Sequence, residues 1–207
     1  MILAVSALPI PVAPPASSPD DTERRFTIRG VSWDQYLALR EMLDDHPALR
    51  MTYAEGTLEL MSPSKRHERS KTTLGRLVET YALARDLRVY GGGQTTFRHV
   101  AAERGLEPDE CYWVGQDEGE YPHIAIEVAL SRSDVDKLAI YATMGVREVW
   151  LWRGERVEVM ILGADGYALA VRSALLPELD MEELARHARM ADQADATRAW
   201  WGWLAGR

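Results

Sequence analysis

Apolar residues along the chain recur with two periods, one typical of helices and one typical of strands. The clearest helical pattern covers residues 66–85, where the apolar stripe consists of Leu74, Leu77, Val78 and Tyr81. Ser32 and Ser133 stand before two further helical patterns as candidate N-caps. Helices are therefore predicted over 33–44, 66–85, 134–144, 179–189 and 194–204, the first of them ended by His46-Pro47.

Alternation and short apolar runs predict strands between these helices. The turn signal Glu55-Gly56 divides residues 49–61 into a hairpin. Residues 123–128 form a nearly continuous apolar run, which is typical of a strand covered on both faces. One further strand is predicted over 89–98, where three glycines interrupt the pattern. Others are predicted over 108–114, 147–152, 156–162 and 167–171. This order predicts an α/β (α+β) fold with a mixed central sheet flanked by helices.

Composition bounds the class of protein. At 207 residues, with 46% hydrophobic and 27% charged side chains, the chain is typical of a soluble globular protein. Residues 1–21 are rich in proline and serine and are predicted to be a flexible tail. A single domain over 22–207, ending in a helical extension, is expected to follow. No apolar run is long enough to cross a membrane, and the lone Cys111 suits a reducing cytoplasm.

The net charge of -8 argues against non-specific binding of duplex nucleic acid by the whole surface. A local basic patch beside an acidic site remains compatible with that charge.

Two acids and a lysine fall near the ends of predicted elements. Asp109 lies at the start of one strand, Glu127 near the end of the next, and Lys137 in the first turn of the following helix. Mg²⁺ prefers oxygen ligands, so Asp109, Glu127 and the carbonyl of Val128 could hold it with positions left for water. A nearby lysine can orient or deprotonate the attacking water and offset phosphate charge. The pattern predicts metal-dependent phosphodiester hydrolysis.

Each of these residues alone is more often a turn, solvated or surface residue. Glu127, however, closes an apolar run for which the pattern predicts burial, and a buried carboxylate requires a partner. The three residues together therefore favour a catalytic role over a purely structural one.

These segments resemble the PD-(D/E)XK nuclease superfamily, and within it the Uma family of restriction endonucleases. The resemblance spans residues 30–205, and its motifs stand at 53–63, 67–68, 107–112, 126–131, 136–138, 140–141 and 145–150. It implies a restriction-endonuclease-like fold, a DNA substrate and Mg²⁺ as cofactor, with Mn²⁺ able to substitute.

By this resemblance Asp109 is the first acid of the motif, Glu127 the second and Lys137 its lysine. Many members carry the lysine two residues after the second acid, where this chain has Ala129, so the resemblance implies a lysine that has migrated to the helix. Glu68 resembles the additional helical acid of some members and is counted as a catalytic candidate.

Two further groups have alternative interpretations. The start of the 66–85 helix could contact a nucleic-acid backbone or form a solvated face, and its candidates are Lys65, Arg66, His67, Arg69 and Lys71. Trp200, Trp201 and Trp203 in the tail could stack on bases, but packing or a homodimer contact is favoured.

Two other functions compete with a cytoplasmic Mg²⁺-dependent DNA endonuclease. One is a catalytically silent nucleic-acid-binding or interaction domain with the same fold, which the acidic net charge favours. The other is a metal-dependent hydrolase of a small phosphate ester.

Overall fold

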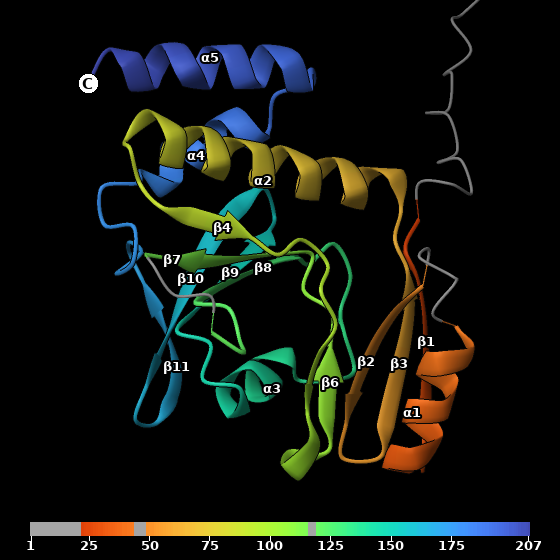
Figure 1. Cartoon of the computed structure of the whole chain (residues 1–207). Coiled ribbons are helices and arrows are strands. Elements are labelled where there is room, and N and C mark those ends of the chain that lie inside the picture. The colour runs from red at the N-terminus through yellow and green to blue at the C-terminus, as the bar shows by residue number, and fades with distance from the viewer. Residues whose placement is uncertain (1–21, 44–48, 116–118) are drawn as a thin grey trace, which may run out of the picture.

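The computed structural model describes residues 22–43, 49–115 and 119–207, and these residues form two β-sheets and five α-helices (Figure 1). The predicted tail 1–21 and the predicted helix end at His46-Pro47 lie outside the described residues. Within the described part, no helix combines the length and the apolar character needed to cross a membrane.

The larger sheet has six strands in the order β11-β10-β9-β8-β7-β4. Its strands are β4 (Val89–Gly91), β7 (Glu110–Val114), β8 (Ile124–Val128), β9 (Glu148–Arg153), β10 (Arg156–Gly163) and β11 (Gly166–Ala170). β8 and β9 run parallel, whereas the other neighbours are antiparallel. All five residues of β8 are buried, as its apolar run predicts. The predicted mixed central sheet is confirmed.

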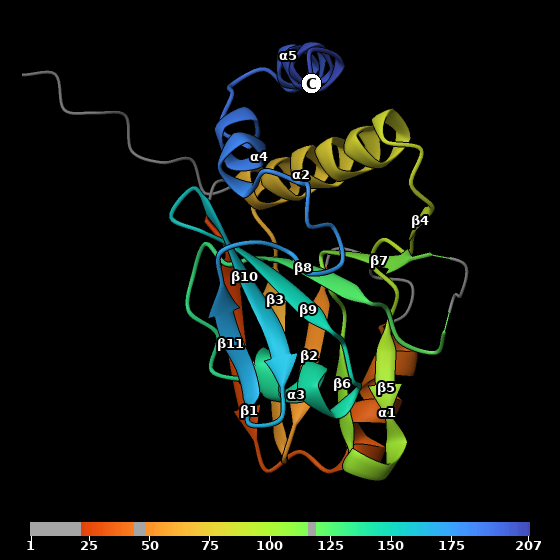
Figure 2. The ribbon, with the colours of Figure 1, turned by 90° about the vertical axis from the view of Figure 1, so that its left-hand side faces the viewer.

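Three helices cover one face of this sheet: α2 (Lys65–Ala84), α4 (Met181–Ala188) and α5 (Gln193–Ala205). Figures 1 and 2 show them stacked on the same side of the sheet, with α5 outermost. The predicted stripe of α2, including Leu74 and Leu77, packs in one cluster with Ile126 of β8 and Trp150 of β9. The sequence periodicity thus identified the inner face of α2 correctly.

The tail helix α5 packs onto α2. Trp200 is fully buried, and its indole Nε1 donates a hydrogen bond of 2.9 Å to the carbonyl of Leu77. Trp203 stacks on Trp200 with ring centroids 5.0 Å apart, and the Arg207 guanidinium lies over the ring of Trp203. Of the three tail tryptophans, only Trp201 is exposed.

A second sheet has five antiparallel strands in the order β1-β3-β2-β6-β5. They are β1 (Arg24–Arg29), β2 (Arg50–Ala54), β3 (Thr57–Ser62), β5 (Phe97–His99) and β6 (Arg104–Leu106). Helix α1 (Trp33–Met42) packs on this sheet through Tyr36. Helix α3 (Lys137–Thr143) contacts both β6 and β11 and lies between the two sheets (Figure 1).

The prediction of one interrupted strand over 89–98 is wrong, because β4 and β5 belong to different sheets. The chain changes sheets at Gly92, whose amide donates to the carbonyl of Cys111 at 2.9 Å. A Cβ on Gly92 would lie 2.5 Å from the Trp113 ring and 2.7 Å from the Cys111 sulfur, so this crossing leaves no room for a side chain. Strands β1 and β6 and the 3₁₀ turn Val100–Ala102 were not predicted at all.

One of the two predicted serine caps is correct. Ser32 caps α1, and Gln35 completes the reciprocal capping box. Helix α3 begins at Lys137, and its N-cap is Asp136 rather than Ser133. The Ser133 hydroxyl is bonded to Glu59 instead, because the loop before α3 folds back onto the second sheet.

Candidate active site

Strand pairing brings the two candidate acids together. β7 and β8 pair with Glu110 opposite Ile126, and the amide of Asp109 donates to the carbonyl of Ile126 at 3.2 Å. Asp109, one residue before β7, therefore lies beside Glu127 of β8. The predicted pairing of these two segments is confirmed, but the strand begins at Glu110, so Asp109 precedes it and is not part of it.

Glu127 is 4% exposed and accepts two short hydrogen bonds from helix α3. The ammonium of Lys137 donates to Oε2 at 2.6 Å, and the hydroxyl of Tyr141 donates to Oε1 at 2.6 Å. Lys137 and Tyr141 are one helical turn apart, so they share a face. Tyr141 was not among the predicted site residues, and its spacing from Lys137 is the signal that could have identified its contact with Glu127.

Burial and neighbouring charges set the protonation of this pair. Burial raises the pKa of Glu127; the ammonium of Lys137 opposes that rise, and the charge of Asp109 adds to it. Burial would lower the pKa of Lys137, but the carboxylates of Glu127 and Asp109 raise it above its ordinary value. Lys137 is therefore a cation at neutral pH in this arrangement.

Asp109 is 1% exposed, and both of its carboxylate oxygens are engaged. The amide of Val128 donates to Oδ2 at 2.7 Å, and Nε2 of His67 donates to Oδ1 at 2.8 Å. Burial would raise the pKa of Asp109, but these hydrogen bonds and the charges of His67 and Lys137 hold it below its ordinary value. Asp109 is thus an ionised carboxylate with a fixed orientation.

His67 connects Asp109 to Glu23. The His67 ring is fully buried, and its Nδ1 donates to Oε1 of Glu23 at 2.5 Å. Burial would lower the pKa of His67, but hydrogen bonds to Asp109 and Glu23 raise it to about 9, so both ring nitrogens are donors. His67 was predicted as a substrate contact, whereas the structure places it behind Asp109. Glu23 was not predicted.

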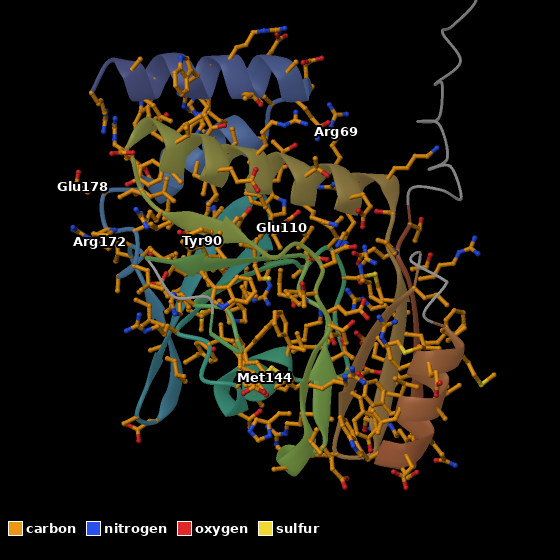
Figure 3. The ribbon with its side chains drawn as sticks, viewed as in Figure 1. Arg69, Tyr90, Glu110, Met144, Arg172 and Glu178 are labelled. Carbon is orange, nitrogen blue, oxygen red and sulfur yellow. The ribbon has the colours of Figure 1, made fainter. Side chains whose placement is uncertain are left out.

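The other candidates on α2 point in several directions. Glu68 is not among the partners of Asp109; it pairs with Arg50 at 3.2 Å and Lys71 at 3.4 Å. Arg66 is exposed and lies 3.8 Å from Glu155 in the β9–β10 turn. Lys65 and Arg69 are exposed, and Figure 3 shows Arg69 on the side of α2 that faces α5.

Glu110 follows Asp109 directly but faces the opposite side of the sheet. Its carboxyl carbon lies 3.3 Å from the position that a Cβ on Gly75 would occupy, and Figure 3 shows Glu110 between α2 and β7. Burial raises the pKa of Glu110 to about 7, Lys71 opposes the rise, and the charges of Glu79 and Asp109 add to it. The alternation of the strand therefore separates two neighbouring acids into different environments.

A pocket of about 700 Å³ opens beside the cluster. Glu127 and Lys137 line it together with the loop 129–136, Arg25 of β1 and Arg153 of β9. Asp109 lies behind Glu127 and does not line this pocket. The pocket is therefore the side from which a substrate can reach the Glu127–Lys137 pair.

The two buried acids are the candidate ligands for a hard divalent cation. No three His, Cys, Asp or Glu side chains converge into a metal cluster within the described ranges. Asp109 and Glu127 are nevertheless buried on neighbouring segments, and the charge of Asp109 raises the pKa of Glu127. Two carboxylates suit Mg²⁺, which keeps several waters among its ligands. The residues present therefore fit such an ion.

Residues 33–191 match a protein-family model described as "Uma2: Putative restriction endonuclease". The matched region is more than half of the chain and contains Asp109, Glu127 and Lys137, whereas Glu23 and Arg25 precede it. Comparison with curated proteins produced no match.

Proposed function

The chain belongs to the Uma2 restriction-endonuclease family, and from this membership we propose that it is a metal-dependent endonuclease that hydrolyses DNA phosphodiester bonds. The observation that carries the proposal is the cluster of Asp109, Glu127 and Lys137, in which both acids are buried and Glu127 and Lys137 line a pocket of about 700 Å³. Residues 22–207 are proposed to act as one nuclease domain.

The proposed cofactor is Mg²⁺, with Mn²⁺ as a substitute of the same oxygen preference. Asp109 and Glu127, with the backbone carbonyl of Val128, would hold it. When bound, such an ion supplies a water of lowered pKa and stabilises the leaving oxygen. The three residues contribute the negative charge and the rigid strand backbone that such an ion requires.

Lys137 is proposed to assist the attacking water. Its pKa is raised by Glu127 and Asp109, so the side chain is charged at neutral pH. A charged ammonium can orient a water by donating a hydrogen bond to the water oxygen and can offset the charge that develops on phosphate. This role requires no proton to leave Lys137.

The contacts with DNA are proposed for the exposed basic residues near the start of α2. Lys65, Arg66 and Arg69 are exposed there, and Lys71 is half-buried beside Glu68. Phosphate contacts by such side chains position a nucleic acid without reading its sequence. Glu68 is proposed to act indirectly, through its ion pairs with Arg50 and Lys71.

Specific observations favour each of two alternatives. All four carboxylate oxygens of Asp109 and Glu127 already accept hydrogen bonds from protein groups, which favours a catalytically silent binding domain. A pocket of about 700 Å³ also has the size of a small-ligand site, which favours a hydrolase of a small phosphate ester.

Plasmid nicking by wild type and Glu127→Ala, with Mg²⁺ and with Mn²⁺, tests the proposal. We expect wild type to nick plasmid with either ion and Glu127→Ala to be inactive. Calorimetric titration of each ion into both proteins accompanies the assay. Wild type that binds DNA but leaves it intact with both ions would favour the silent domain. Hydrolysis of a small phosphate ester without plasmid nicking would favour the other alternative.

A homodimer through the C-terminal tail is also proposed. Its contact surface would include only one of the three tail tryptophans. Trp200 and Trp203 pack within the chain, whereas Trp201 is 49% exposed. Trp201 and Ala84 line one groove at the adjoining ends of α5 and α2, and Leu83 beside it is 75% exposed. This exposed apolar area is the proposed contact.

A further inference from the structure

Glu23 and the strand β1 lie before the region that matches the family, yet they reach the centre of the candidate site. We propose that Glu23 is a positioning residue that orients Asp109 through His67, so that the N-terminal strand completes the site. This inference rests on the proposed function, because it assigns to Asp109 the role of a metal ligand.

A continuous chain of hydrogen bonds carries the inference. Glu23 accepts from Nδ1 of His67 at 2.5 Å, and Nε2 of His67 donates to Asp109 at 2.8 Å. The His67 ring is fully buried, and the side chain of Glu23 is 3% exposed. Rotation of the ring would leave buried polar atoms without partners, which is unfavourable. Glu23 therefore fixes the plane of the ring.

The fixed ring in turn fixes the Asp109 carboxylate. His67 bonds one oxygen of Asp109, and the amide of Val128 bonds the other. A carboxylate oxygen has two acceptor positions, so one position on each oxygen remains for a further ligand. Partners behind a ligating group orient it, and their loss typically weakens metal binding about 10–100-fold.

The other end of the chain is anchored to the loop that lines the pocket. The hydroxyl of Ser131 donates to Oε2 of Glu23 at 2.5 Å, and Nε of Arg25 donates to Ser131 at 2.7 Å. Arg25 also donates to Oε1 of Glu59 at 2.6 Å, and Glu59 accepts from the amide of Asp134 in the same loop. Glu23 thereby links the orientation of Asp109 to the wall of the pocket.

The test compares Glu23→Ala and Glu23→Gln with Thr27→Val as a matched control. Thr27 lies on β1, four residues after Glu23, and its hydroxyl donates to Asp134 of the same loop at 2.8 Å. Thr27→Val therefore removes a bond between β1 and the loop without touching the chain to Asp109. The readouts are the Mn²⁺ dissociation constant by calorimetry and the kcat and KM of plasmid nicking, with circular dichroism as the check of folding.

We expect Glu23→Ala to raise the Mn²⁺ dissociation constant about 10–100-fold and to lower kcat, while KM for DNA stays within about twofold. Glu23→Gln should recover most of the Mn²⁺ affinity, because its amide oxygen can still accept from His67. Thr27→Val should bind Mn²⁺ as wild type does. If Glu23→Ala fails to fold, Glu23→Asp, whose arm is one methylene shorter, should show the weakened affinity instead.

Unchanged Mn²⁺ affinity in Glu23→Ala, or an equal loss in Thr27→Val, would overturn the positioning role. Wild type that binds Mn²⁺ but does not cut DNA would overturn the proposed nuclease activity. The Mn²⁺ affinities of the Glu23 variants would then still decide the positioning role. Wild type that binds no Mn²⁺ would overturn both proposals.

Discussion

The two faces of the six-stranded sheet are built from the same strands and each buries an apolar cluster, but only the face toward α3 also holds the Glu127 site. In β8, Ile124, Ile126 and Val128 point toward α2 and pack in its apolar cluster. Ala125 and Glu127 alternate with them and point toward α3, where Lys137 and Tyr141 meet Glu127. The alternation of one buried strand is enough to separate an apolar core from a charged cluster.

The two faces contribute differently to the free energy of folding. Burial of apolar side chains under α2, α4 and α5 is favourable in proportion to the area removed from water. Burial of Asp109, Glu127 and Lys137 costs desolvation energy that their mutual contacts only offset. We therefore expect variants of the apolar residues under α2 to change stability and variants of the charged cluster to change activity.

The largest effect is expected from Glu127→Ala on the charged face. Loss of one of two carboxylate ligands should abolish nicking and metal binding, because few other ligands are available. Removal of Glu127 also leaves the half-buried ammonium of Lys137 without this ion-pair partner, which destabilises the fold. Glu127→Gln is the matched control, since it keeps the shape and can still accept from Tyr141. Glu127→Gln that folds like wild type and still cuts DNA would contradict the metal-ligand assignment.

Lys137→Ala should lower kcat by roughly 10²- to 10⁴-fold and leave metal binding in place. Glu127 and Asp109 raise the pKa of Lys137 and so stabilise its charged form. The cation itself is therefore expected to act. Lys137→Arg should therefore retain more activity than Lys137→Ala in single-turnover nicking. Equal inactivity of the two variants would instead indicate that Lys137 must give up a proton, which a guanidinium cannot do.

On the apolar face, Trp200→Ala should lower the free energy of unfolding by about 3–5 kcal/mol, the usual cost of deleting a buried tryptophan. Urea denaturation measures this change. Metal affinity, measured well below the midpoint, should stay unchanged because α5 does not contact the charged cluster. A parallel loss of metal affinity would show that the two faces are coupled through α2.

In the metal-free protein, the unfolding free energy should depend on pH through His67 of the charged cluster. The pKa of His67 is raised from 6.5 to about 9, so its stabilisation is fully present below pH 6.5 and is lost as the pH rises through 9. The lowered pKa values of Asp109 and Glu23 act only in acid, outside this window. Unfolding free energy should fall by about 1–3 kcal/mol between these limits. The His67→Gln variant should show a flatter profile, and an equal slope would exclude His67 as its source.

The smallest effect on stability is expected at the outer end of α5. Trp201→Ser combined with Leu83→Ser should change the unfolding free energy by less than about 0.5 kcal/mol per site, as is usual for exposed positions. If the proposed homodimer uses this surface, light scattering at tens of micromolar should show a dimer for wild type and a monomer for the double variant. A wild-type monomer would exclude the dimer at that concentration.

The charged face could be predicted from sequence in its main features, because each residue follows from a local rule. Glu127 closes an apolar run, Asp109 directly precedes the neighbouring strand, and Lys137 begins the next helix. Strand pairing and one helix turn are enough to bring these three side chains together. The apolar stripe of α2 followed from helical periodicity in the same way.

Strand β1 could not be predicted because its pattern is inverted. Arg25 and Thr27 point toward the site and its loop, whereas Phe26 and Ile28 are 66% and 44% exposed. A search for apolar inward positions therefore finds no strand there. The contact between Glu23 and His67 joins residues 44 positions apart, and no local pattern indicates it.

The bonds of β1 to the pocket loop also affect the order of events during folding. The bond between Ser131 and Glu23 closes a separation of 108 residues, and the bond between Thr27 and Asp134 closes one of 107. Closing such long loops costs chain entropy before the contact stabilises anything, so contacts of this kind tend to slow folding. During synthesis, β1 leaves the ribosome long before its partner loop exists. A nascent chain therefore cannot assemble the site, and in refolding experiments nicking activity is expected to return only after the helical signal has recovered.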